Sequence, residues 1–353
     1  MKKVWITSSV PFLLAGLLIS GAWKAGVASK EAAAKEGEGA AGPRLFKSTL
    51  TFLESLGPDQ KKKALFEFRD EERFNWHFIP RDRKGIPLKE LSNEQRAKAA
   101  EVLRGGLSAT GAKRAEDVMS LEDILRGIEG PSARFQRDPL LYYLSVFSSP
   151  SKDARWGVRI EGHHLSINWT LQGEKLLAST PIFYGANPSI VRNGPKKGLR
   201  VLSGVEDVAR ELVSSLGPEA LQACKGDKGG AVPEEVPGHQ TQRYAGPYPE
   251  GIAAASLPGG GKALLAKLIR EYTNNLAPDL AAAIEKEIGM EELKDVHFAW
   301  RGGLKEFEPH SYLIHGPTFV INYTNMQNEA AHVHSAFRTL KGDFGAAAAT
   351  GGS

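Results

Sequence analysis

Five of the chain's nine histidines lie in three short segments whose residue pattern is typical of strands. They are His163, His164, His297, His332 and His334. Side chains two positions apart in a strand share a face, so His332 and His334 can present two imidazoles to one metal ion. If that segment were helical, the two rings would diverge. The spacing therefore predicts a metal site only if this segment is a strand.

The neighbours His163 and His164 would point to opposite faces of a straight strand, whereas Glu161 shares a face with His163. Two imidazoles from one strand and a third imidazole or a carboxylate from another are ligands that zinc, iron or copper accept, with a position left open for water or substrate. The predicted metal ligands are His163, His164, His332 and His334. Glu161 is expected to be a further ligand or a general base. The alternative, that these histidines belong to a buried, hydrogen-bonded polar core, fits the sequence equally well.

Amides and one arginine in apolar surroundings suggest where a small molecule would bind. Asn187 precedes Pro188, and Asn325 and Arg338 flank the His332-Val333-His334 segment. These groups suit a carboxylate-bearing or amide-bearing ligand. We predict that Asn187, His297 and Asn325 contact ligand and that Arg338 orients substrate. Both asparagines are also natural turn residues, which is the commoner use of asparagine at such positions.

The elements that must position these side chains include several strands in the second half of the chain. The pattern from Arg155 to Phe183 is typical of strands: apolar and polar residues alternate on both sides of the two histidines, and the alternation changes phase between Ile160 and Leu165. A bulge or a tight turn at residues 162–164 would explain the change and would re-aim the two histidines. Further strands are expected at 296–300, 311–315 and 318–323.

Helical signals dominate before residue 150 and recur between the strands. Ser92 and Gln95 form a capping box before a helix at 96–103, and Pro58 suits the first turn of a helix at 58–66. Other helices are expected around 121–128 and at 139–147, 206–216, 218–225, 264–272 and 280–288. Residues 74–89 resemble a loop, and residues 226–260 a long surface excursion. The predicted fold is α+β: a helical N-terminal part packed on a mainly antiparallel sheet formed by the second half.

The N-terminus carries the features of an export signal. Lys2 and Lys3 precede a mostly apolar run from Val4 to Trp23, followed by small residues. Residues 1–28 are therefore expected to be a signal peptide or, if uncleaved, an N-terminal anchor, and the protein is expected to be periplasmic or extracellular. Residues 29–43 resemble a spacer. Residues 44–345 are expected to form a single domain, helical at 44–150 and sheet-rich at 151–345. Residues 346–353 are expected to form a disordered tail.

The remaining composition mainly excludes functions. The 353 residues carry a net charge of +4, of which Lys2, Lys3 and Lys24 supply three, so no nucleic-acid partner is expected. A membrane partner is expected only through the N-terminal segment. The single cysteine, Cys224, excludes an intrachain disulfide and a cysteine-rich zinc site. Neither the GxSxG motif of serine hydrolases nor the HExxH motif of zinc proteases is present.

Four segments together resemble a known family: WGVRIEGHHLSINW, TPIFYGANPSIVRNGPKKGLRVL, HFAW and YTNMQNEAAHVHSAFR. The chain resembles the bacterial domain-of-unknown-function family numbered 3500 from about residue 45 to about residue 345. The resemblance implies an exported protein and matches the five histidines one by one, but it implies no particular activity. The chain lacks the acidic stretch expected before HVHS and ends in AAAATGGS where a helical tail is expected, which makes reduced activity or a binding role more plausible.

Two classes of function remain open from the sequence. One is an exported metal-dependent enzyme, a hydrolase or an oxidoreductase, that uses one divalent ion such as zinc, iron or copper. The other is a non-catalytic extracytoplasmic protein whose polar histidine core binds a small molecule. Either would act on a small-molecule substrate or ligand.

Overall fold

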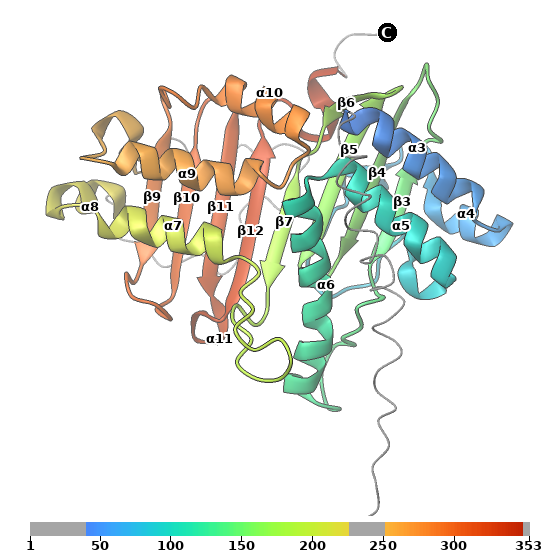
Figure 1. Ribbon diagram of the computed structural model, residues 1–353, viewed down its shortest axis with the longest axis horizontal. Helices are drawn as coiled ribbons and strands as arrows, with labels where there is room; N and C mark the ends of the chain where they lie inside the picture. Colours follow the sequence, from blue (N-terminus) through green and yellow to red (C-terminus); the bar gives the residue numbers. More distant parts are fainter. Residues whose placement is uncertain (1–39, 226–250, 349–353) are drawn as a thin grey trace, which may run out of the picture. The chain divides into compact units, whose positions relative to one another are not determined.

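A single sheet of twelve strands organises residues 40–225 and 251–348, which are the residues that the computed structural model describes (Figure 1). The strand order is β1-β3-β4-β5-β7-β12-β11-β10-β9-β8, with β2 beside β3 and β6 beside β5. All of these pairs are antiparallel except β1 with β3. The strands are β1 (Leu65–Phe66), β2 (Ile86–Pro87), β3 (Tyr143–Phe147), β4 (Arg155–Gly162), β5 (Leu165–Gln172), β6 (Lys175–Ala178), β7 (Ile182–Ala186), β8 (Ile252–Ala253), β9 (His297–Gly302), β10 (His310–His315), β11 (Phe319–Met326) and β12 (His332–Thr339).

The long helices cover one face of this sheet (Figure 1). On that face the Trp169 indole donates to the Gly106 carbonyl of α5, and the Tyr312 hydroxyl donates to the Val205 carbonyl of α7. The helices are α3 (Ala41–Glu54), α4 (Pro58–Ala64), α5 (Asn93–Gly106), α6 (Ala109–Glu129), α7 (Ser203–Ser214), α8 (Pro218–Lys225), α9 (Gly261–Thr273) and α10 (Pro278–Ile288), with short helical turns at Glu71–Phe74, Leu88–Glu90, Ala254–Ser256, Gln327–Ala330 and Asp343–Ala348.

The opposite face of the central strands is covered by two segments distant in sequence. Trp76 and Phe78 pack with Phe344 against Phe183 of β7 and Ala336 of β12, and all five side chains are buried. Because alternate residues share a face, His332 and His334 of β12 project to this same side, away from the helices. The histidines of interest therefore lie in a buried layer between the sheet and the 74–79 segment.

Much of the sequence interpretation is confirmed. The fold is α+β with a mainly antiparallel sheet, although β1, β2 and β3 come from before residue 150. The capping box is present, since the Ser92 hydroxyl accepts from the Gln95 amide and the Gln95 side chain accepts from the Ser92 amide. His332-Val333-His334 is a strand, and residues 162–165 form a tight turn between β4 and β5.

Three local predictions are wrong. Residues 139–147 contain no helix; Tyr143–Phe147 are β3, because a short apolar run fits a buried strand as well as a helix. The 74–89 segment is not wholly loop, since Ile86–Pro87 pair with β3. The spacer expected through residue 43 is too long: α3 begins at Ala41, and Gly42 packs so closely on the Glu174 carbonyl that a Cβ would lie 1.9 Å from its oxygen.

Other boundaries lie partly outside the described residues. The predicted signal segment, residues 1–28, and residues 226–250 of the predicted surface excursion lie outside the described residues. Residues 251–260 of that excursion are described, and they contain β8 and a helical turn. The expected tail starts inside the Asp343–Ala348 turn. Residues from Ala40 onward form one compact unit. Within the described ranges, none of the helices combines the length and apolar character needed to cross a membrane.

Candidate metal centre

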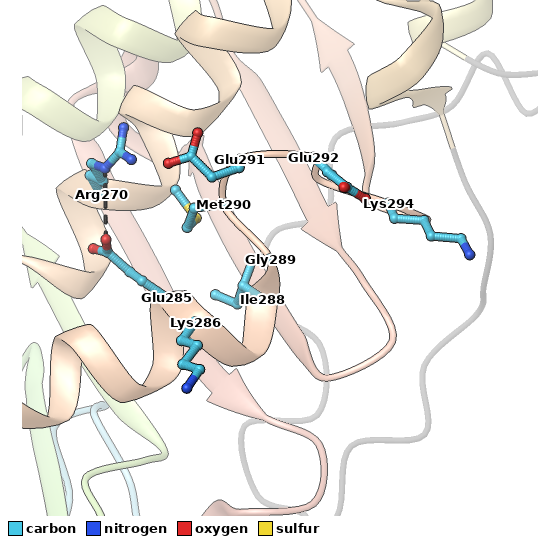
Figure 2. A pocket seen from close by; sticks show the side chains of 9 residues that line it. All are labelled: Arg270, Glu285, Lys286, Ile288, Gly289, Met290, Glu291, Glu292 and Lys294. Atoms are coloured by element: carbon cyan, nitrogen blue, oxygen red, sulfur yellow. Dashed lines mark ion pairs between the residues drawn. The ribbon is translucent and has the colours of Figure 1, made fainter.

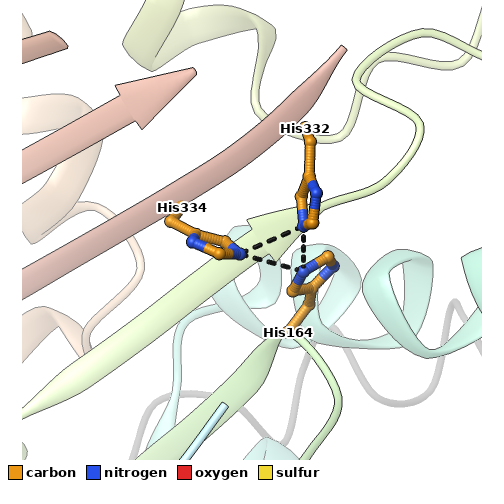
Figure 3. A group of neighbouring side chains, drawn as sticks. All are labelled: His164, His332 and His334. Atoms are coloured by element: carbon orange, nitrogen blue, oxygen red, sulfur yellow. Dashed lines mark hydrogen bonds between the residues drawn. The ribbon is translucent and has the colours of Figure 1, made fainter. Parts of the chain in front are cut away.

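Three imidazoles converge in the layer beneath the central strands. The Nε2 atom of His332 lies 2.7 Å from that of His164, and the Nε2 atom of His334 lies 3.1 Å from each of the other two. Figure 3 shows the three rings pointing toward one another, two from β12 and one from the turn between β4 and β5. Each neutral imidazole carries a single N–H, so three Nε2 atoms in a triangle cannot all satisfy one another. Their convergence is the arrangement expected around one cation.

The β4–β5 turn and a glycine on β7 bring His164 to this point. His164 has a positive φ of 61°, and its amide donates to the Phe78 carbonyl over 2.8 Å. Its ring crosses the backbone of β7 at Gly185, where a Cβ would lie 2.9 Å from His164 Cγ. Only a residue without a side chain leaves this space, so Gly185 lets His164 reach across one strand to β12.

Strand β12 and its neighbours fix the other two histidines. The His332 amide donates to Asn325 Oδ1 over 3.0 Å, which anchors the start of β12 to the end of β11. The His334 ring packs against Phe78 and Phe183, with ring centroids 5.0 and 5.6 Å away. His334 is buried and His332 is half-buried, so solvent reaches the group from the His332 side.

Burial keeps the His164 and His332 rings neutral. Desolvation, with smaller contributions from the neighbouring histidines, holds the pKa of His164 well below its usual value. Desolvation and the nearby His334 lower the pKa of His332 to about 3. Neutral imidazoles offer their lone pairs to a metal, which protonated rings cannot do. The two rings are therefore poised as ligands at neutral pH.

His163, the neighbour of His164, takes a supporting position. Its ring stacks on the His164 ring with centroids 3.8 Å apart. Its Nδ1 atom lies 2.5 Å from Glu122 Oε1 and 3.3 Å from Arg137 Nη1, and Arg137 is itself paired with Glu129. Desolvation lowers the pKa of His163, so we assign its proton to Nδ1, which then donates to Glu122. Glu122 thus holds the ring against which His164 packs.

The sequence profile of a family described as "protein of unknown function (DUF3500)" matches residues 38–346. The chain belongs to the DUF3500 family. No curated protein and no solved structure matches it. The family assignment confirms the resemblance seen in the GHH, GANP and HVHS segments, and these segments supply His164, Gly185, His332 and His334.

Two residues expected to take part in catalysis lie away from the three rings in this DUF3500 chain. Glu161 is buried, where it accepts from the His77 amide over 3.0 Å and pairs with Arg159 at 3.3 Å. Arg338 pairs with Asp343 at 2.5 Å and lies four residues beyond His334, about 13 Å along the strand. The His77 hydrogen bond thus joins the 72–83 segment to Glu161 of β4, and the Arg338–Asp343 ion pair joins the C-terminal turn to β12.

The three predicted ligand-binding residues of the DUF3500 chain have separate locations. His297 lies on β9, three strands from β12, and stacks on His315 with centroids 5.2 Å apart. Asn325 contacts the site through the His332 backbone. Asn187 follows Ala186, which pairs with Val333, so continuation of the ladder places Asn187 opposite His332 and on its face. Of the three, Asn187 and Asn325 adjoin the histidine group and His297 does not.

Sequence reasoning missed Glu122, Arg137 and Gly185. Glu122 lies on helix α6, where a glutamate normally faces solvent, and nothing in the sequence marks it as buried. Arg137 follows this helix in an irregular segment. Gly185 had a signal, because a glycine inside a strand often marks a close approach of another group.

A hollow of about 440 Å³ lies elsewhere in the DUF3500 chain, at the C-terminal end of α10. Figure 2 shows its mixed lining, in which Arg270 pairs with Glu285 and Lys286 and Glu291 are close by. None of its lining residues belongs to the strands that carry the three histidines. Opposite charges side by side, without a buried unpaired group, give this hollow no evident ligand.

Proposed function

We propose that the protein is a metal-dependent enzyme whose single divalent ion is held by His164, His332 and His334. The observation that carries the proposal is the convergence of three Nε2 atoms within 3.1 Å of one another. Two of the rings are kept neutral by burial, as a ligand must be.

Three nitrogen ligands are typical of catalytic rather than closed structural sites. A metal ion with open positions lowers the pKa of a bound water or accepts an oxygen donor of a substrate. The surrounding residues shape the metal site. Phe78 and Phe183 exclude water from its inner side, and Asn187 lies with His332 on its outer side. The support is geometric, and it favours an enzyme over a purely structural polar core.

Metal analysis of the purified protein tests the proposal. After loading with a divalent metal and removal of excess, one equivalent should remain bound. His332→Ala and His334→Ala should each lower retention at least tenfold. His297→Ala is the matched control, since it removes a histidine from another part of the same sheet and should leave the stoichiometry at one. Equal retention in all four proteins would refute the proposal.

We also propose that the protein is exported. The support is the sequence of residues 1–28 alone, with its two lysines, apolar run and small residues. Expression of the full chain followed by cell fractionation and mass measurement of its N-terminus tests this. A periplasmic or secreted product that starts near residue 23 or 29 supports cleavage, membrane-bound full-length protein supports an anchor, and soluble full-length protein in the cytoplasm refutes export.

A further inference from the structure

The spacing of the three Nε2 atoms distinguishes between coordination geometries. A tetrahedral ion with metal–nitrogen bonds of about 2.0–2.1 Å separates its nitrogen ligands by about 3.3–3.4 Å. Three nitrogens on one face of an octahedron, with similar bonds, lie about 3.0 Å apart. The separations in this site are 2.7, 3.1 and 3.1 Å. All three are shorter than the tetrahedral value; the two separations of 3.1 Å are close to the octahedral value, and the third is shorter than both.

The three rings also come from a single side of the site. His332 and His334 project from one strand, and His164 reaches them across Gly185 of the adjacent strand. The packed aromatic rings of Phe78 and Phe183 lie beside His334, whereas His332 is half-buried and the nearby Asn328 and Glu329 are exposed. Access to the ion is therefore from the His332 side, near the turn between β11 and β12.

Asn187 provides a nearly buried polar group on that side. The residue is 9% exposed. The ladder between β7 and β12 places it on the face of His332. An amide at this position can donate to an oxygen of a bound ligand.

On the basis of the proposed metal centre, we infer that the three histidines occupy one face of a six-coordinate ion of the iron(II) or manganese(II) type. The opposite face then has three positions for exogenous ligands. Two of them suit a small chelating substrate with oxygen donors on adjacent carbons, as in a dicarboxylate or a 2-oxo acid, and Asn187 would donate its amide to one of those oxygens. The third position holds water or another small molecule.

Cobalt(II) reports the geometry directly, because six-coordinate cobalt has weak visible bands and four-coordinate cobalt has intense ones. The metal-free full chain is titrated with cobalt(II), with His332→Ala and His297→Ala beside it. We expect weak bands that saturate at one equivalent in the wild type and in His297→Ala and that are lost in His332→Ala. Intense bands would overturn the six-coordinate assignment and leave the metal centre intact. No binding to the wild type would refute the proposed function itself.

Oxalate, a chelating dianion, and acetate, its monodentate counterpart, then test the ligand class on the cobalt form. We expect oxalate to bind at least tenfold more tightly than acetate. Asn187→Ala should weaken oxalate binding about tenfold without loss of cobalt, which a merely structural role of Asn187 would not do. Asn274→Ala, at an exposed asparagine elsewhere, is the control. Equal affinity for the two anions, or an unchanged oxalate affinity in Asn187→Ala, would overturn this part of the inference.

Discussion

The His164 imidazole lies directly on the backbone of Gly185, so closely that a Cβ at Gly185 would come within 2.9 Å of His164 Cγ and 3.0 Å of Cδ2. The same glycine amide donates to the His164 carbonyl over 2.8 Å. This contact joins the β4–β5 turn to the strand beside β12. The convergence of the three histidines therefore depends on the absence of a side chain at one position.

Gly185→Ala should displace the His164 ring and weaken metal binding at least tenfold while the fold is retained. The added methyl group would meet the His164 ring, whose backbone amide is held by the Phe78 carbonyl, so the ring must leave its present position. Metal retention and circular dichroism measure the two effects. Gly217→Ala is the control, because a Cβ there meets nothing within 4 Å. Unchanged metal retention in Gly185→Ala would contradict this explanation.

Glu122→Ala should lower the free energy of unfolding by about 1–3 kcal/mol, because it leaves the buried His163 Nδ1–H without an acceptor. Glu122→Gln keeps an acceptor oxygen and should cost less. Denaturant unfolding at neutral pH measures both, with the exposed Glu94→Gln as control. If alanine and glutamine cost the same, the hydrogen bond to His163 is not what Glu122 contributes.

The metal-free protein should lose stability as the pH falls from about 6.5 toward 3. The pKa of His332 is near 3 in the folded chain and near its ordinary 6.5 when unfolded, so in this window the unfolded chain binds more protons. His332 alone contributes a slope of up to about 1.4 kcal/mol per pH unit. His332→Gln removes this group and should give a shallower dependence in urea unfolding at several pH values. An unchanged slope would show that His332 is not neutral in the folded protein.

Cys224 should resist thiol reagents in the folded protein. Burial raises the pKa of its thiol to about 12, so at pH 8 the reactive thiolate is far rarer than in a free cysteine. Labelling with iodoacetamide should be about a thousandfold slower than for a small thiol. Labelling in denaturant provides the comparison, and rapid modification of the native chain would show that α8 opens readily.

Local sequence patterns predicted much of the fold because strands and turns depend on interactions between residues that are close in sequence. The alternation in β4, β5 and β12 and the phase change at 162–164 follow from the period of a strand and from a two-residue turn. Tyr143–Phe147 form a strand and not the predicted helix, because residues on both faces of this strand are buried, which removes the alternation.

The site required information that local patterns do not carry. His332 and His334 were paired correctly by their spacing, but the choice of His164 over His163 depends on the positive φ of His164 and on the strand order β5-β7-β12. Glu161 and Arg338 have residue types suited to catalysis, yet each pairs with a buried residue of opposite charge, Arg159 and Asp343 respectively. Neither strand order nor burial of a charge can be read from spacing alone.

The central claim is that one metal ion is bound by His164, His332 and His334 through their Nε2 atoms. X-ray absorption spectroscopy of the protein loaded with one equivalent of iron(II) tests it most directly. The account predicts three imidazole nitrogens at about 2.0–2.2 Å, with the remaining positions filled by oxygen, and loss of one imidazole in His334→Ala. A spectrum with one imidazole or none, or one that His334→Ala leaves unchanged, would contradict it.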